Sequence, residues 1–239
     1  MALVQEERKK LPKLGGKKLY HKLSGALDEV GKIGRDKFFD ILRRNKLLVK
    51  RKTNYAVTTN SRHHFWVYKN LLTDKELLRH NEGWVADITY VRTRKGFVYL
   101  FLLTDAFSRK IIGWAVSNSL SIEGGIDALK MALKQREQAL PLIHHSDRGV
   151  QYCSKEYVKL LTNNNISISM TEQNHCYENA MAERVNGILK QEFLLDSEFE
   201  NIAVCRQAVR QAVFLYNEER PHWALALQTP SQVHKSITV

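Results

Sequence analysis

Three acidic residues stand in surroundings that suit chemistry on a phosphate group. Asp87 lies inside the apolar stretch 84–88, where a buried charge is costly unless it is paired or bound to a metal. Asp147 follows the apolar run 141–145, and Glu183 lies in a segment with helical periodicity. Carboxylates that converge from neighbouring elements form a site for hard divalent cations. Two such ions can drive an in-line phosphoryl displacement without any nucleophilic side chain.

Each of these acids, taken singly, has an ordinary alternative as a surface or ion-paired residue. Taken together, in this order and with these neighbours, the three favour a shared metal site. A fourth acid, Asp105, ends a predicted strand and is also a candidate ligand. Its neighbours Thr104, Ala106 and Phe107 favour a turn instead.

The segment 177–190 is predicted to be the helix around which the site is organised. Its apolar residues recur at helical spacing: Met181, Val185, Ile188 and Leu189. Asn179 stands where an N-cap belongs. Glu183, Asn186 and Lys190 form a second stripe, roughly opposite the apolar face. A carboxylate and a lysine two turns apart can hold a metal ion and a phosphate together, although a solvated charged face is the alternative.

The elements that must position these residues can be predicted from the apolar pattern. Strands are expected at 84–93, 97–105, 110–118, 141–145 and 166–170, and helices at 121–137, 155–163, 177–190 and 205–219. Short turns join the first three strands into an antiparallel meander, and the later strands alternate with helices. This implies an α/β fold with a mixed five-stranded sheet and flanking helices. The order of elements resembles the ribonuclease H-like architecture.

Positive charge is concentrated at the start of the chain. The net charge is +12, and residues 1–66 hold 17 Lys/Arg against 6 Asp/Glu, whereas the remaining 173 residues hold 20 against 19. A segregated basic segment indicates a polyanionic partner, and nucleic acid is favoured over a membrane surface. The sequence has no apolar run of transmembrane length and no apolar core of a signal peptide, and its three cysteines form no C-x-x-C pair. We therefore expect no membrane partner and a cytoplasmic location.

Two short amphipathic helices are predicted at 17–30 and 35–47, joined by a turn at Gly31 to Gly34. This is the outline of a small helix-turn-helix-like domain, with a plain helical hairpin as the alternative. The outward cations of the second helix are expected to contact DNA: Arg35, Lys37, Arg43 and Arg44. A basic linker follows, and its cations are expected to lie along a phosphate backbone unless the linker is merely solvated: Lys50, Arg51 and Lys52.

Three segments together resemble the catalytic core of the Asp-Asp-Glu transposases and retroviral-type integrases. They are Trp84 to Tyr90, His144 to Tyr152 and Glu178 to Glu183. The stretch Tyr216 to His222, followed by Thr229-Pro230, resembles the usual C-terminal motif of bacterial insertion-sequence transposases whose gene is split into two frames. The helical pair resembles the domain that begins the second frame of those proteins.

The resemblance implies specific roles for the candidate residues. Asp87, Asp147 and Glu183 are expected to bind two Mg²⁺ or Mn²⁺ ions and to be catalytic, and Lys190 and Asn179 to contact DNA. The implied reaction is cleavage of one strand at the element's end, followed by attack of the freed 3′-hydroxyl on another phosphodiester. The chain departs from the family in the loop 173–177, which lacks a common Gly-Asn-Pro run, and after His222, where a serine is common.

The resemblance also predicts partners and a cellular setting. The partners are DNA, as element ends and target, further copies of the chain on that DNA, and the first-frame transposase product as a fusion or separate chain. The expected location is the bacterial cytoplasm, where the protein would be associated with the nucleoid. A non-catalytic DNA-binding regulator derived from a transposase is the main alternative, and an RNA-hydrolysing enzyme of the same fold explains less of the chain.

The predicted domain organisation has five parts. They are a flexible basic N-terminus at 1–16, a helix-turn-helix-like DNA-binding domain at 17–50, a linker at 51–80, a ribonuclease H-like integrase catalytic core at 81–200, and a C-terminal helix and tail at 201–239.

Overall fold

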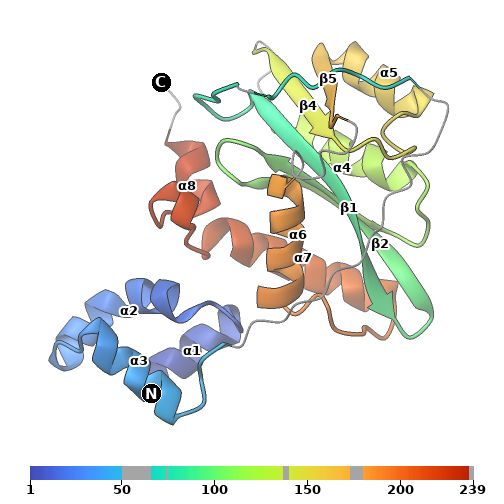
Figure 1. Ribbon diagram of the computed structural model, residues 1–239. Coiled ribbons are helices and arrows are strands. Elements are labelled where there is room, and N and C mark those ends of the chain that lie inside the picture. Colours follow the sequence, from blue (N-terminus) through green and yellow to red (C-terminus); the bar gives the residue numbers. More distant parts are fainter. Residues whose placement is uncertain (50–65, 74, 137–139, 173–179, 237–239) are drawn as a thin grey trace.

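A mixed five-stranded sheet forms the centre of the computed structural model, which describes residues 1–49, 66–73, 75–136, 140–172 and 180–236 (Figure 1). The strands lie in the order β3-β2-β1-β4-β5. Their bounds are β1 (Gly83–Thr93), β2 (Gly96–Asp105), β3 (Ile111–Ser117), β4 (Leu142–Ser146) and β5 (Ile166–Met170). The first three strands pair antiparallel, whereas β4 runs parallel to both β1 and β5. This confirms the predicted fold class.

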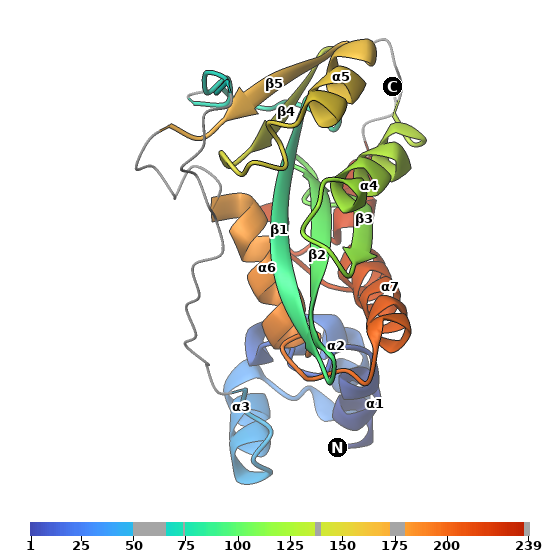
Figure 2. The same ribbon diagram turned by 90° about the vertical axis from the view of Figure 1, so that its right-hand side faces the viewer.

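Helices cover both faces of the sheet (Figure 2). Side chains alternate along β1, so that Trp84 and Ala86 pack with α4 (Glu123–Leu133) and α5 (Lys155–Asn163) on one face. On the other face, Val91 packs with α6 (Ala180–Glu192) and α7 (Ile202–Glu218). Because Asp87 shares the parity of Val91, its side chain belongs to the α6 face.

Helix α4 lies in close contact with β3 at Gly113. A Cβ atom built at Gly113 would lie 2.1 Å from the carbonyl oxygen of Ala128 and 3.0 Å from its carbonyl carbon. Both atoms belong to the backbone of α4, so no side-chain movement can make room for a methyl group. The glycine therefore sets the distance between this helix and the sheet.

Replacing Gly113 by Ala should destabilise the fold by about 3 kcal/mol, because the helix and the strand must separate to accept the methyl group. The measurement is urea-induced unfolding at equilibrium. The matched control is Gly25→Ala within a helix, where a Cβ atom meets nothing within 4 Å. That control should be neutral or stabilising by up to about 1 kcal/mol. Equal stability of the two variants would contradict the close packing.

Three N-terminal helices form a separate small core. They are α1 (Ala2–Lys10), α2 (Gly16–Gly31) and α3 (Arg35–Arg44), and they pack around Leu14, Leu19, Phe38 and Leu42. The second and third helices were predicted. The first differs from the prediction, because residues 1–16 were expected to be flexible, whereas Val4, Leu11 and Leu14 are buried in this core. Three apolar residues in a basic segment were too sparse to indicate a helix, but they complete a core that two helices cannot close.

The N-terminal helices dock on the end of α6 and on α7 (Figure 1). Phe193 and Leu215 pack against their core, and the Lys22 ammonium lies 2.6 Å from a carboxylate oxygen of Glu219. The backbone N–H of Lys13 also donates a hydrogen bond to the carbonyl of Glu192, with a donor–acceptor distance of 3.3 Å. The small core of the N-terminal helices is therefore supported by the rest of the chain.

The chain after α7 continues into a 3₁₀ turn (Trp223–Leu225) and α8 (Pro230–Lys235). Thr229 caps α8 through a capping box with Gln232, which confirms the short helix expected after Thr229-Pro230. Within the described residues, no helix has both the length and the apolar character needed to span a bilayer.

Candidate active site

The strand register brings Asp87 and Asp147 to neighbouring positions. Strands β1 and β4 pair in parallel with Val85 opposite His145. Two residues further along each chain, Asp87 and Asp147 therefore stand at equivalent positions and on the same face. Both residues are half-buried. Burial, the neighbouring charge of Asp147 and the charge of Glu183 together raise the pKa of Asp87 to about 7.

Asn186 on α6 holds the carboxylate of Asp87. Its Nδ2 donates a hydrogen bond of 2.7 Å to Oδ2 of Asp87, while the backbone N–H of Ile88 donates to Oδ1 at 2.9 Å. Asn186 is only 5% exposed, so its place on an outward stripe opposite the apolar face was predicted wrongly. Its Oδ1 atom is buried and accepts no hydrogen bond from the described residues. This leaves a carbonyl-type oxygen without a donor beside the acidic pair.

Asp147 is positioned by the turn that follows β4. The backbone N–H of Gly149 donates a hydrogen bond of 2.9 Å to Oδ1 of Asp147. A Cβ atom at position 149 would lie 3.0 Å from the same oxygen and 3.1 Å from Oε1 of Gln151. A glycine at this position therefore allows the close approach of the backbone to the carboxylate.

Glu183 lies on the first turn of α6, one turn before Asn186, and its side chain is exposed. Its charge contributes to the raised pKa of Asp87, so the two carboxylates are close enough to interact. Among the described residues, however, no group of three acidic, His or Cys side chains is close enough to hold a metal ion. The structure thus brings Asp87 and Asp147 together and leaves Glu183 at the rim.

Lys190 lies two turns after Glu183 on the same helix. Its ammonium lies 4.2 Å from the ring centroid of Tyr90, an arrangement suited to a cation–π contact. Burial lowers the pKa of Lys190, and the charge of Asp87 opposes this shift. The predicted proximity of Lys190 to the acidic pair is therefore present.

The α3 cations that were predicted to contact DNA do not lie at the acidic pair. The α3 cations are exposed on the N-terminal helices, and two of them pair with acids of their own helix: Arg35 with Asp36 at 2.9 Å, and Arg43 with Asp40. Figure 1 shows α3 at the opposite end of the molecule from β4 and β5. Asn179, Lys50, Arg51 and Lys52 lie outside the described residues.

Asp105 is a structural acid, as its turn-forming neighbours predicted. It is fully buried and accepts hydrogen bonds from the backbone N–H of Asn81 (2.7 Å) and from the N–H and hydroxyl of Ser108 (2.8 and 2.7 Å). These bonds fix the turn between β2 and β3 and use the acceptor positions that a metal ion requires.

Sequence reasoning missed a buried ion pair behind the site. Arg220 is 1% exposed, and its Nε and Nη2 donate to the two carboxylate oxygens of Glu192 at 2.9 and 2.7 Å. The two residues are 28 positions apart, on α6 and on the segment after α7, so no local periodicity indicated the contact. The only signal was the resemblance of Tyr216 to His222 to a family motif.

Comparison with known proteins places the site in a family. Residues 78–176 and residues 164–230 match two families, each described as "Integrase core domain". The chain is 34% identical over 201 residues to the insertion element IS600 uncharacterized 31 kDa protein of Shigella sonnei, covering 83% of this chain and 74% of that protein. It is 36% identical over 178 residues to the transposase InsF for insertion sequence IS3A of Escherichia coli strain K12, covering 74% of this chain. The chain spans 60% of the length of that transposase.

Solved structures support the fold. The HTLV-2 integrase catalytic core domain superposes with a TM-score of 0.53 at 24% identity, covering 66% of this chain and 98% of that domain. An integrase chain of the simian T-cell lymphotropic virus intasome gives a TM-score of 0.57 at 19% identity and covers 94% of this chain and 76% of that chain. Taken with the sequence relatives, these findings show that the chain belongs to the integrase-core family of transposases encoded by bacterial insertion sequences.

Proposed function

We propose that this chain catalyses divalent-metal-dependent DNA strand cleavage and 3′-hydroxyl strand transfer at the ends of an insertion sequence. The observation that carries the proposal is the pair formed by Asp87 on β1 and Asp147 directly after the parallel strand β4, with the pKa of Asp87 raised to about 7. Two carboxylates held together on one face repel each other, which is costly unless a cation or proton lies between them. Glu183 is the third acid of the same site.

The residues fit a hard divalent cation such as Mg²⁺ or Mn²⁺. All the available ligands are oxygens, and the buried Oδ1 of Asn186, which lacks a donor, can accept a hydrogen bond from a metal-bound water. Asp87 and Asp147 would bind the ion, and Glu183 would complete the site by turning inward from the first turn of α6. Two bound ions would supply activation of the attacking oxygen and stabilisation of the leaving oxygen. The HTLV-2 integrase core was solved in complex with magnesium.

The chain's own residues bind and orient the DNA. Asn186 holds the Asp87 carboxylate through its 2.7 Å hydrogen bond, so that the second oxygen can face the substrate. Lys190 is placed to contact the phosphate beside the reacting bond. In the first step a water oxygen bonds to phosphorus and the P–O3′ bond breaks, which frees a 3′-hydroxyl. In the second, that oxygen attacks another phosphodiester and releases a new 3′-hydroxyl.

The partners follow from this reaction. They are the DNA ends of the element and the target DNA, with α3, Lys50 to Lys52 and Asn179 as further contacts to the duplex. Joining two ends requires more than one copy of the chain on the DNA. We include among the partners the first-frame transposase product, as a fusion or as a separate chain.

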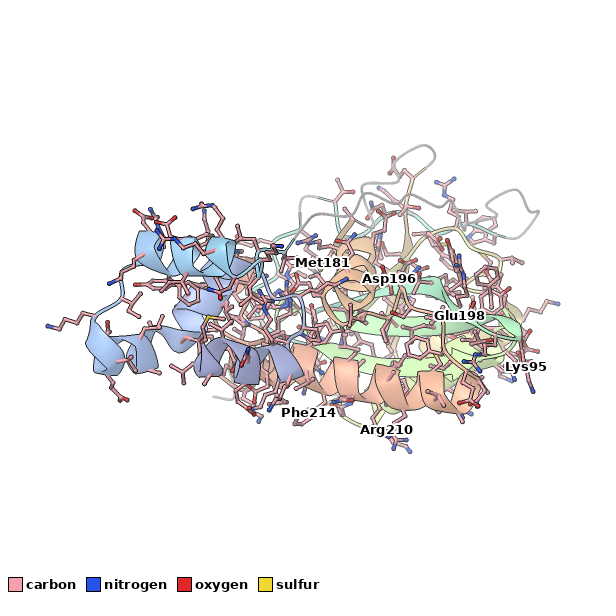
Figure 3. The ribbon with its side chains drawn as sticks, turned by 90° about the horizontal axis from the view of Figure 1, so that it is seen from below. Lys95, Met181, Asp196, Glu198, Arg210 and Phe214 are labelled. Atoms are coloured by element: carbon pink, nitrogen blue, oxygen red, sulfur yellow. The ribbon has the colours of Figure 1, made fainter. Side chains whose placement is uncertain are left out.

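The test is strand transfer on a labelled duplex carrying the end of the element, with Mg²⁺ or with chelator. Glu183→Gln should lower joining by at least about 10²-fold, because it removes a charge that acts on the transition state. The matched control is Glu198→Gln, an exposed acid near Lys95 and the β1–β2 turn (Figure 3). The backbone of Phe199, the neighbour of Glu198, forms hydrogen bonds with the backbone of Arg92 and of Arg94. These two residues lie about six positions along the chain from Asp87, so Glu198 is roughly 20 Å from the acidic pair.

Both the chain alone and its fusion to the first-frame product should be assayed. The proposal is supported if either protein joins DNA in a metal-dependent way. Glu183→Gln should lose this activity, and Glu198→Gln should keep it. DNA binding without joining by either protein would overturn it and favour the non-catalytic DNA-binding regulator.

A further inference from the structure

Four cationic side chains gather beside α6, where the N-terminal helices meet the rest of the chain. Lys18 comes from α2, Arg109 from the β2–β3 turn, Arg184 from α6 and Arg220 from the segment after α7. Arg220 is paired with Glu192. The other three have no ion pair with any residue that the structure describes, although Lys18 is only 8% exposed and Arg109 is half-buried. The charge of Glu192 acts on Lys18 and the charge of Asp105 acts on Arg109, in both cases from beyond ion-pair distance. Positive charge therefore exceeds negative charge in this region.

Side-chain contacts and charge interactions link the members of this cationic cluster. The guanidinium of Arg109 contacts the sulfur of Met181, which lies one turn before Arg184 on α6. The guanidinium carbon of Arg220 lies 5.9 Å from the ring centroid of Tyr216, and the ring of His222 lies 5.0 Å from the same ring. Burial lowers the pKa of His222 to about 2, and nearby positive charges add to this shift: Arg220, Lys18, Arg109 and Arg184.

Two buried polar atoms in the cluster lack partners. The hydroxyl of Tyr216 and Nε2 of His222 are buried, and neither makes a hydrogen bond with the described residues. Burial, followed by the charge of Arg220, also lowers the pKa of Lys18 to about 8. Buried polar groups are normally paired, and clustered cations normally have counter-ions. A bound anion with several acceptor oxygens would satisfy both requirements.

We propose that Lys18, Arg109 and Arg184 bind a phosphodiester group of the DNA strand that enters the acidic site. This inference rests on the proposed function. Arg184 directly follows Glu183 on the first turn of α6, and both side chains are exposed. Their side chains leave the helix about 100° apart, so a strand that crosses this turn at the acid has the cation on its flank. A multidentate guanidinium site suits phosphate oxygens better than a single ammonium does.

The experiment is the salt dependence of binding to a fluorescein-labelled DNA duplex of arbitrary sequence. Arg184→Gln removes one charge from an exposed side chain and should reduce the slope of log K against log salt concentration by about 0.9. Arg184→Lys should restore the slope, because the phosphate contact is electrostatic. The matched control is Arg210→Gln, also exposed on a helix; Figure 3 labels Arg210 on α7, on the opposite side of the molecule from Met181.

The outcomes separate this inference from the proposed function. An unchanged slope in Arg184→Gln, equal to that of Arg210→Gln, would overturn the phosphate site and leave strand transfer untouched. A reduced slope without metal-dependent joining would support the phosphate site and overturn strand transfer. If neither the wild-type chain nor its fusion to the first-frame product binds the duplex at low salt, both are overturned.

Discussion

Replacing Asp87 by Asn should stabilise the metal-free protein at pH 8 and, at the same time, abolish strand transfer. Burial and the neighbouring carboxylates raise the pKa of Asp87 from 3.8 to about 7. A raised carboxyl pKa means that ionisation opposes folding. The protonated group costs nothing below about pH 4, stability is lost as the pH rises towards 7, and the full penalty applies above pH 7. Asn carries no charge at any pH, so the variant escapes the penalty.

The expected gain is about 1–3 kcal/mol at pH 8 in chelator, with no gain near pH 4. Urea-induced unfolding at both pH values measures it. Asp127→Asn, at an exposed position on α4, is the control and should change stability little. Mg²⁺ at about a thousand times its Kd should reverse the ranking, since it would then stabilise the wild-type protein that binds it by about 4.1 kcal/mol. If Asp87→Asn is no more stable than wild type at pH 8, the carboxylates do not repel each other as described.

Replacing Glu192 by Gln should destabilise the protein by about 3–5 kcal/mol. The guanidinium of Arg220 is almost completely buried and donates two hydrogen bonds to the Glu192 carboxylate. Removing the negative partner leaves a buried charge without compensation, which costs more than the pair itself contributes. Glu192 also ends α6, where its carbonyl accepts from Lys13 of the N-terminal segment. The loss should therefore loosen the docking of the N-terminal helices as well.

Denaturant unfolding and proteolysis of the N-terminal helices measure these two effects. The matched control is Glu6→Gln. The Glu6 carboxylate lies 2.8 Å from the ammonium of Lys9 in an exposed ion pair, so its loss should change the free energy of unfolding little. Replacing both members of the buried pair, with Arg220→Met and Glu192→Leu, should recover much of the lost stability, because apolar residues need no counter-charge. A small effect of Glu192→Gln alone would mean that solvent reaches Arg220.

Elements with a strong local signal could be predicted from the sequence. Helix α5 runs from Lys155 to Asn163 as expected, because Ser154 caps it by accepting from the N–H of Tyr157. Strand β5 also has its predicted bounds. The meeting of Asp87 with Asp147 could be anticipated as well, because the element order implies neighbouring strands and their ends share an edge. Glu183 was correctly placed on a helix near them.

Contacts between elements that are distant in the sequence could not be predicted. Whether Asn186 faces the sheet depends on how α6 rolls against β1, which helical periodicity does not specify. The pairing of Glu192 with Arg220 arises only when α6 packs against the segment after α7. The approach of Lys18 to Arg184 arises only when the N-terminal helices dock. For the same reason α1 was missed, since Leu11 and Leu14 find their partners in other helices.

The strand order itself explains where the acidic pair lies. From β1 the chain continues through β2 and β3 on one side, whereas β4 and β5 are added on the other side. Strand β1 is therefore the point of the sheet at which connections leave in opposite directions, and the short strand β4 ends beside the middle of β1. The location of the site is thus a property of the chain path rather than of the acids. Substitutions of Asp87 or Asp147 should change what the site does without changing where it is.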